Sequence, residues 1–165
     1  MSNIAVVYHS KHGSTEKYAK WIAEETGAVL FKEKECKAKQ LVDFDVIVYG
    51  GAVHAGGILG INFLQKGIKD LVGKKVVVFA VGLNVDDEKI QEECREINFV
   101  KELADLPCYF LKGAYDPEKI KGVDKAIMSM TKKMINRDSQ LYRDIENGAD
   151  YVDIRYIEPI LKELK

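Results

Sequence analysis

Four apolar runs, separated by helical patterns, restrict the fold of this chain more than any other feature. They cover residues 4–8, 46–49, 76–81 and 108–111, are rich in β-branched side chains, and each leads into a turn signal or a polar segment. Because the runs are continuous rather than alternating, they are typical of strands buried on both faces of a parallel sheet. A shorter, more mixed run at residues 29–31 predicts an edge strand.

Helical periodicity fills most of the segments between these strands. Apolar side chains recur at helical spacing in residues 15–26, 58–71, 87–103 and 153–164. Gly27 is placed to end the first of these helices, and Asp153 to cap the last. Pro159 predicts a kink or a late start in the last helix, because an interior proline removes a hydrogen bond. Around residues 38–41 the expected helix is short or degenerate.

Strands that alternate with helices predict a doubly wound α/β domain. Right-handed crossovers give a three-layer sandwich around a five-stranded parallel sheet of order 2-1-3-4-5. A length of 165 residues fits one domain, residues 1–165. Residues 115–146 are surplus to this plan and contain an amphipathic segment, 123–135, which predicts an extra helical segment before the last helix. Long insertions in compact domains are often functional.

Charge and cysteine content exclude several classes of protein. The net charge is −1, from 25 basic and 26 acidic residues, so no basic footprint for nucleic acid is present. The three cysteines form no Cys-x-x-Cys pair, which argues against a zinc or dithiol site and predicts buried or half-buried thiols. No secretion signal or transmembrane segment is evident. We expect a cytoplasmic protein without a bound metal.

A loop rich in hydroxyl groups follows the first strand and opens directly into a helix. It consists of Ser10, Lys11, His12, Gly13, Ser14 and Thr15. A phosphate needs several converging donors, which hydroxyl groups and the free N–H groups of a helix N-terminus supply. By itself the loop fits an ordinary capped turn equally well, but the carboxyl end of a first strand is where open α/β sheets bind ligands. No P-loop or Gly-x-Gly-x-x-Gly motif is present.

Residues 6–15 resemble the flavodoxin signature, a hydroxyl-rich loop after the first strand. The resemblance implies a flavodoxin-like fold in which this loop holds the 5′-phosphate of FMN. Ser10, Gly13, Ser14 and Thr15 stand at matching positions. His12 replaces the usual hydroxyl residue, so one side-chain donor differs.

The same resemblance implies two loops that enclose the flavin ring. We expect one, within residues 50–58, to contribute Ala52, Val53, His54, Ala55 and Gly56, and the other Gly82, Leu83, Asn84, Val85 and Asp86. Neither loop has a Trp or Tyr to stack on the ring, and Trp21 is predicted to pack in the first helix. His54 fits a hydrogen-bond donor to the ring and a solvent-exposed loop histidine equally well.

Within the family, residues 50–54 and the surplus segment look like the menaquinone-dependent protoporphyrinogen oxidases of flavodoxin type. Residues 125–130 fall where those proteins carry an extra helix, and residues 151–153 are also similar. The resemblance implies an FMN-dependent oxidoreductase that oxidises protoporphyrinogen IX, with a quinone or a redox protein as partner, and contact with the inner face of the membrane. No catalytic side chain is predicted, because the flavin carries the redox chemistry.

Two other functions stay open: an electron carrier between redox proteins, and a binding module without redox activity. The methionine-rich surplus helix likewise has two interpretations. It is either an added packing helix, or an apolar lid or membrane-facing surface with basic flanks at Lys121, Lys125, Lys132, Lys133 and Arg137.

Overall fold

The computed structural model describes residues 2–165 and is built on a parallel sheet. The strands are β1 (Ile4–His9), β2 (Val29–Lys32), β3 (Val46–His54), β5 (Lys75–Gly82) and β6 (Cys108–Lys112). Their order, β2-β1-β3-β5-β6, is the predicted one. A short strand, β4 (Gly57–Ile58), folds back antiparallel on the end of β3.

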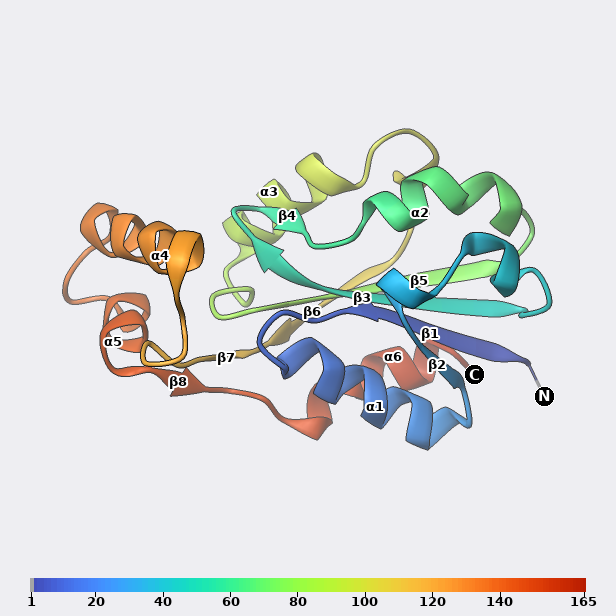
Figure 1. The fold of residues 1–165 in the computed structure, drawn as a ribbon, viewed down its shortest axis with the longest axis horizontal. Helices are drawn as coiled ribbons and strands as arrows, with labels where there is room; N and C mark the ends of the chain where they lie inside the picture. Colours follow the sequence, from blue (N-terminus) through green and yellow to red (C-terminus); the bar gives the residue numbers. More distant parts are fainter. Residues whose placement is uncertain (1) are drawn as a thin grey trace.

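Helices cover both faces of the sheet, which completes the three layers (Figure 1). One face carries α1 (Ser14–Thr26) and α6 (Glu158–Glu163); the other carries α2 (Asn62–Gly67) and α3 (Glu88–Asn98). Short 3₁₀ turns extend or connect these helices: Glu33–Glu35, Ala38–Leu41, Ile68–Leu71, Lys101–Leu103 and Ile154–Ile157. The turn at Ala38–Leu41 stands where the sequence predicts a degenerate helix.

The strand side chains alternate between two apolar layers. In β1, Val6 and Tyr8 pack against α1 and the C-terminal segment, while Ala5 and Val7 belong to the core under α2 and α3. The buried stretches are residues 4–8 of β1, 46–51 of β3 and 76–81 of β5, as the continuous apolar runs predict. Trp21 packs edge-on against Tyr18, and the three cysteines are buried free thiols.

Three predicted helices are shorter in the structure. The one expected at residues 58–71 begins only at Asn62, because Ile58 pairs with β3 and Gly60 adopts a left-handed conformation with φ 75°. The helix expected at 87–103 ends at Asn98. The amide of Asn98 donates back to the carbonyl of Cys94, and its side-chain oxygen accepts from the Ile58 N–H, so the helix end is fixed to β4.

The last helix starts late, one of the two predicted outcomes of Pro159. A 3₁₀ turn capped by Asp153 precedes it, and the proline occupies the first turn of α6, where its missing N–H costs no hydrogen bond.

The loop predicted at residues 50–58 is for the most part a strand. β3 continues through Gly50 and Gly51 to His54 and pairs with β5 as far as Ala52. A Cβ at Gly50 would lie 2.0 Å from Cζ of Phe79, so glycine serves close packing here rather than loop flexibility.

The surplus segment forms a small unit of its own beyond the carboxyl ends of the strands (Figure 1). It contains α4 (Gly122–Met134) and α5 (Gln140–Asn147), framed by an antiparallel pair, β7 (Ala114–Tyr115) and β8 (Ala149–Asp150). The amphipathic segment predicted at residues 123–135 is therefore helical. Within residues 2–165, no helix has the length and apolar character needed to span a bilayer.

Candidate functional site at the carboxyl edge of the sheet

A cavity of about 310 Å³ lies between the sheet edge and the surplus segment. Four stretches of chain line it: the loop after β1, the end of β3, the end of β5 with the loop after it, and the segment from β6 to α4. Its walls are mainly apolar, with polar groups concentrated near the N-terminus of α1. An apolar pocket with a few convergent polar groups is typical of a small-molecule site.

The loop after β1 leaves hydroxyl groups free to donate to a ligand. Ser10 Oγ accepts a hydrogen bond from the Gly13 N–H at 3.1 Å, and Ser14 Oγ accepts from the Ala114 N–H at 3.2 Å. Because both oxygens act as acceptors to the backbone, their own O–H groups can point elsewhere. Gly13 precedes α1 with φ 101° and no side chain caps the helix, so the first N–H groups of α1 are available to an anion.

Ten of the sixteen predicted site residues line this cavity. They are Ser10, His12, Ser14, Thr15, Ala52, Val53, His54, Ala55, Gly82 and Leu83. The structure thus brings the predicted phosphate loop and both predicted ring loops to one space, although they are far apart in the sequence.

The other six predicted residues lie outside the cavity lining: Lys11, Gly13, Gly56, Asn84, Val85 and Asp86. Val85 is buried beneath its loop and packs against Gly82. A Cβ added to Gly82 would lie only 2.6 Å from Cγ1 of Val85. Asp86 points to Lys112, with 3.1 Å between Oδ2 and Nζ. Gly56 forms the tight turn between β3 and β4 with φ 81°. Only the first half of the loop after β5 therefore faces the cavity.

The surplus segment supplies a wall that the sequence did not assign to the site. Its lining residues are Tyr115, Ile120, Asp124, Ile127, Met128 and Thr131, joined by Gly113 and Ala114 after β6 and by Val81 in β5. Ile127 and Met128 belong to the amphipathic pattern seen in the sequence. Nothing in the sequence pointed to Asp124, whose partners are far away along the chain.

Asp124 joins α4 to the predicted phosphate loop and to the end of β3, the first of the two predicted ring loops. Its Oδ2 lies 2.6 Å from Lys11 Nζ and 3.3 Å from His12 Nε2, and its Oδ1 lies 2.8 Å from His54 Nε2. The hydrogen bonds from Lys11 and His54 lower the pKa of the Asp124 carboxyl to about 2, so it is ionised at neutral pH. One carboxylate thus holds the surplus helix against the rest of the site.

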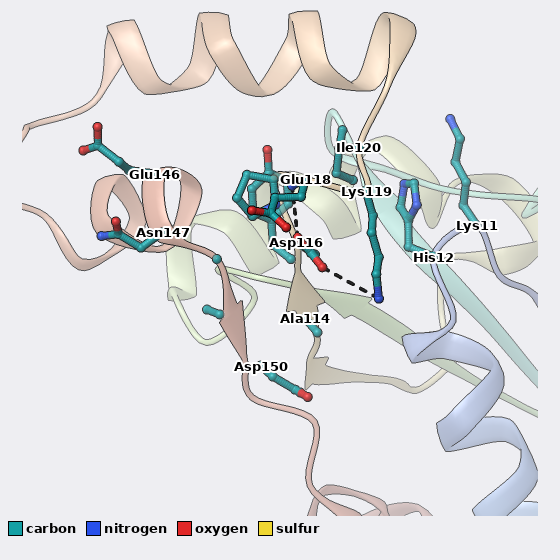
Figure 2. A pocket seen from close by; sticks show the side chains of 14 residues that line it. Lys11, His12, Ala114, Asp116, Glu118, Lys119, Ile120, Glu146, Asn147 and Asp150 are labelled. Atoms are coloured by element: carbon teal, nitrogen blue, oxygen red, sulfur yellow. Dashed lines mark hydrogen bonds and ion pairs between the residues drawn. The ribbon is translucent and has the colours of Figure 1, made fainter.

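A second and wider groove, of about 1210 Å³, opens beside the cavity between the β7–β8 pair and the loop before α4 (Figure 2). Four residues line both spaces: His12, Ala114, Tyr115 and Ile120, whereas Lys11 lines the groove alone. Its remaining charged side chains are Asp116, Glu118, Lys119, Glu146 and Asp150. With four carboxylates against two lysines, this groove does not suit an anionic ligand.

A family model described as a flavodoxin domain matches residues 5–141 of this chain. The chain belongs to the flavodoxin family. Its fold agrees with solved structures of flavodoxins and related flavoproteins. The Trp repressor binding protein from Bacillus subtilis shares 13% identity at a TM-score of 0.51, over 83% of this chain and 100% of that one.

Two further similar structures extend the comparison within the family. Oxidised flavodoxin 2 from Bacillus cereus is 24% identical at a TM-score of 0.45, over 76% of this flavodoxin-family chain and 91% of that one. A Lactobacillus acidophilus flavoprotein solved in complex with FMN is 15% identical at a TM-score of 0.47, over 68% of this chain and 93% of that one. No curated protein matches the chain.

Proposed function

We propose that this flavodoxin-family protein is an oxidoreductase that binds FMN in the cavity at the carboxyl edge of its sheet. The observation that carries the proposal is the convergence of the hydroxyl-rich loop, the end of β3 and the loop after β5 on one apolar space. FMN is the cofactor that the sequence predicts, and it agrees with membership of the family. When bound, FMN supplies the electron-transfer chemistry.

The residues present fit the parts of that cofactor. The O–H groups of Ser10, Ser14 and Thr15 and the N–H groups at the start of α1 suit the phosphate dianion. The apolar surfaces of Val53 and Leu83 suit the flat ring. Within residues 2–165, Tyr115 is the aromatic side chain in the cavity lining, and it comes from the surplus segment rather than from a ring loop.

The wall made by α4 favours an enzyme that acts on a small molecule over a carrier that docks proteins at this face. Ile127 and Met128 close the cavity on the side away from the sheet. A carrier needs an accessible cofactor edge, whereas an enclosed site excludes water and orients a small substrate. The alternative, a flavodoxin-type electron carrier between redox proteins, is supported by family membership alone.

As substrate we propose protoporphyrinogen IX, with a quinone as electron acceptor. What supports this is the apolar wall that α4 gives the cavity, together with basic side chains on the same segment, which suit a largely apolar molecule with carboxylate groups. Lys121, Lys125, Lys133 and Arg137 are exposed, while Lys132 is engaged by Glu146 at 3.2 Å. The acidic groove beside the cavity disfavours the same ligand there. We place the protein in the cytoplasm, in contact with the inner face of the membrane.

The test begins with the absorbance spectrum of the protein after incubation with excess FMN and desalting. Retained flavin bands, and FMN in the supernatant after heating, are the expected result; a colourless protein that does not quench FMN fluorescence overturns the proposal. The loaded protein is then mixed with protoporphyrinogen IX and menadione without oxygen. If the fluorescent porphyrin forms faster than with free FMN, the result supports the proposed enzyme activity. If it does not, the electron carrier is the function that remains.

A further inference from the structure

The cavity lining contains an imidazole–carboxylate pair formed by two elements that are far apart in the sequence. His54 ends β3 and Asp124 stands in the first turn of α4, with 2.8 Å between Nε2 and Oδ1. Asp124 is only 7% exposed and stays ionised at neutral pH, so its oxygens act as acceptors. Nε2 of His54 therefore carries a hydrogen, and Nδ1 is the ring nitrogen available to a ligand in the cavity.

No other group in the described lining is as well suited to exchange a proton at the ring side of the cavity. Burial raises the pKa of Tyr115, and Asp124 titrates in strong acid. His12 belongs to the predicted phosphate loop and contacts the other oxygen of Asp124. An imidazole changes its charge near neutral pH, as proton transfer in water requires.

We propose that His54 is a catalytic residue that passes a proton to or from the molecule reacting with the bound flavin, and that Asp124 is its positioning residue. This inference rests on the proposed FMN site. With a quinone as acceptor, reduction to the hydroquinone takes two electrons and two protons. The two electrons and one of the protons would come from the reduced cofactor bound in the cavity. His54, as imidazolium, gives the second proton to a quinone oxygen and becomes neutral, and solvent then restores its proton.

Asp124 serves this step by fixing the orientation of the ring and by stabilising the imidazolium. The charged groups around it are Lys11 and His12, both on its Oδ2 side. Lys11, 2.6 Å away, holds the carboxylate in place but also offsets part of its charge. The surplus helix thereby gains a second role, since it forms the wall of the cavity and also sets the geometry of His54.

The test compares two acceptors on the FMN-loaded, photoreduced protein by stopped-flow absorbance. Menadione takes up electrons and protons, whereas ferricyanide takes up electrons alone. In His54→Gln we expect reoxidation by menadione to slow by about 10²-fold, the usual size of a general acid contribution, and to lose its pH dependence between pH 5 and 8. Reoxidation by ferricyanide should be unchanged.

Asp124→Asn should slow the menadione reaction in the same direction. His9→Gln is the matched control, because His9 Nδ1 pairs with Glu33 at 3.1 Å outside the cavity lining. An equal slowing with both acceptors, or no slowing with menadione, overturns the inference. If the wild-type protein retains no FMN, the proposed function fails before this test applies.

A measurement independent of turnover is the midpoint potential of the bound flavin across the same pH range. In the wild type, reduction places negative charge beside His54 and should draw a proton onto it, which steepens the fall of the potential with pH. His54→Gln should remove that extra slope. Coincident slopes in the two proteins contradict a role of His54 in proton exchange.

Discussion

Tyr18 in α1 donates its phenolic hydrogen to the carbonyl oxygen of Lys112, at the end of β6, over a distance of 2.6 Å. The phenolic oxygen of Tyr18 in turn accepts a hydrogen bond from the N–H of Asp153 at 3.2 Å. One side chain thus ties the helix that follows the predicted phosphate loop to the two points where the chain leaves the sheet for the surplus segment and returns from it. The position of that segment over the cavity depends on this junction.

Tyr18→Phe should destabilise the protein by about 1–3 kcal/mol, because the Lys112 carbonyl and the Asp153 N–H lose their partner in a buried setting. Urea unfolding followed by circular dichroism measures the change. Tyr156→Phe, at an exposed tyrosine, is the control and should change the stability little. Equal stabilities of the Tyr18 variant and the wild type would show that water replaces the phenol.

Burial raises the pKa of Tyr18 to about 12 from the ordinary 10.0. The neutral phenol is therefore favoured in the folded state. Its contribution to the free energy of unfolding is complete below pH 10 and is lost as the pH rises toward 12. We expect the difference in stability between wild type and Tyr18→Phe to shrink over that range. A difference that stays constant from pH 9 to 12 would contradict this account.

Gly50→Ala should cost about 3 kcal/mol or more, because the added methyl group would collide with the Phe79 ring between two central strands. Gly57→Ala is the matched control, since its Cβ meets only the His54 carbonyl at 3.5 Å, an ordinary contact, and its φ is not positive. Thermal unfolding of the two variants checks the difference. Similar melting temperatures would mean that Phe79 moves aside freely.

Ser10→Ala and Thr15→Val should each weaken FMN binding by about tenfold, because a hydroxyl donor to a charged phosphate is lost. Riboflavin has the same ring without the phosphate, so its affinity should not change. Fluorescence titration with both flavins separates the effects. Equal losses of affinity for FMN and riboflavin would show that this loop does not bind the phosphate.

The sequence predicted the sheet and the hydroxyl-rich loop because both depend on local patterns, whereas the two ring loops were predicted from the family resemblance. Continuous β-branched runs identify the central strands. The hydroxyl-rich loop consists of consecutive residues, so it can be recognised without knowledge of any tertiary contact. The loop predicted at Gly50 and Gly51 was wrong, because a glycine in a strand can be required by a close neighbour. At Gly50 that neighbour is Phe79, which is far away along the chain. Asp124 was missed for the same reason: its partners are Lys11, His12 and His54, and no spacing along the chain links them.

Acid should release α4 from the site. The pKa of Asp124 is lowered to about 2 from 3.8. The stabilisation that its carboxylate gives to the docked α4 is therefore complete above pH 4 and is lost as the pH falls toward 2. Hydrogen–deuterium exchange in residues 122–134, corrected for the intrinsic effect of pH, should speed up over that range. In Asp124→Asn it should be fast already at neutral pH. Protection of α4 that is equal in both proteins at pH 7 would assign its docking to apolar contacts alone.

The outer surface of α4 gives the proposed membrane contact a direct test. Val123, Met130 and Met134 are 74%, 63% and 82% exposed and lie along one line of the helix, and the segment also exposes Lys133 and Arg137. Apolar and basic side chains together favour an anionic bilayer surface.

We therefore expect the protein to sediment with vesicles of anionic lipid more than with vesicles of phosphatidylcholine alone, and less so in high salt. Met130→Glu with Met134→Glu should abolish this binding, because both added carboxylates are repelled by the lipid and the buried apolar area is lost. Val72→Glu is the control: Val72 is 81% exposed on the loop before β5, far along the chain from α4. Binding that survives in the double variant, or that is lost equally in Val72→Glu, would place the contact elsewhere and leave the methionines of α4 without this role.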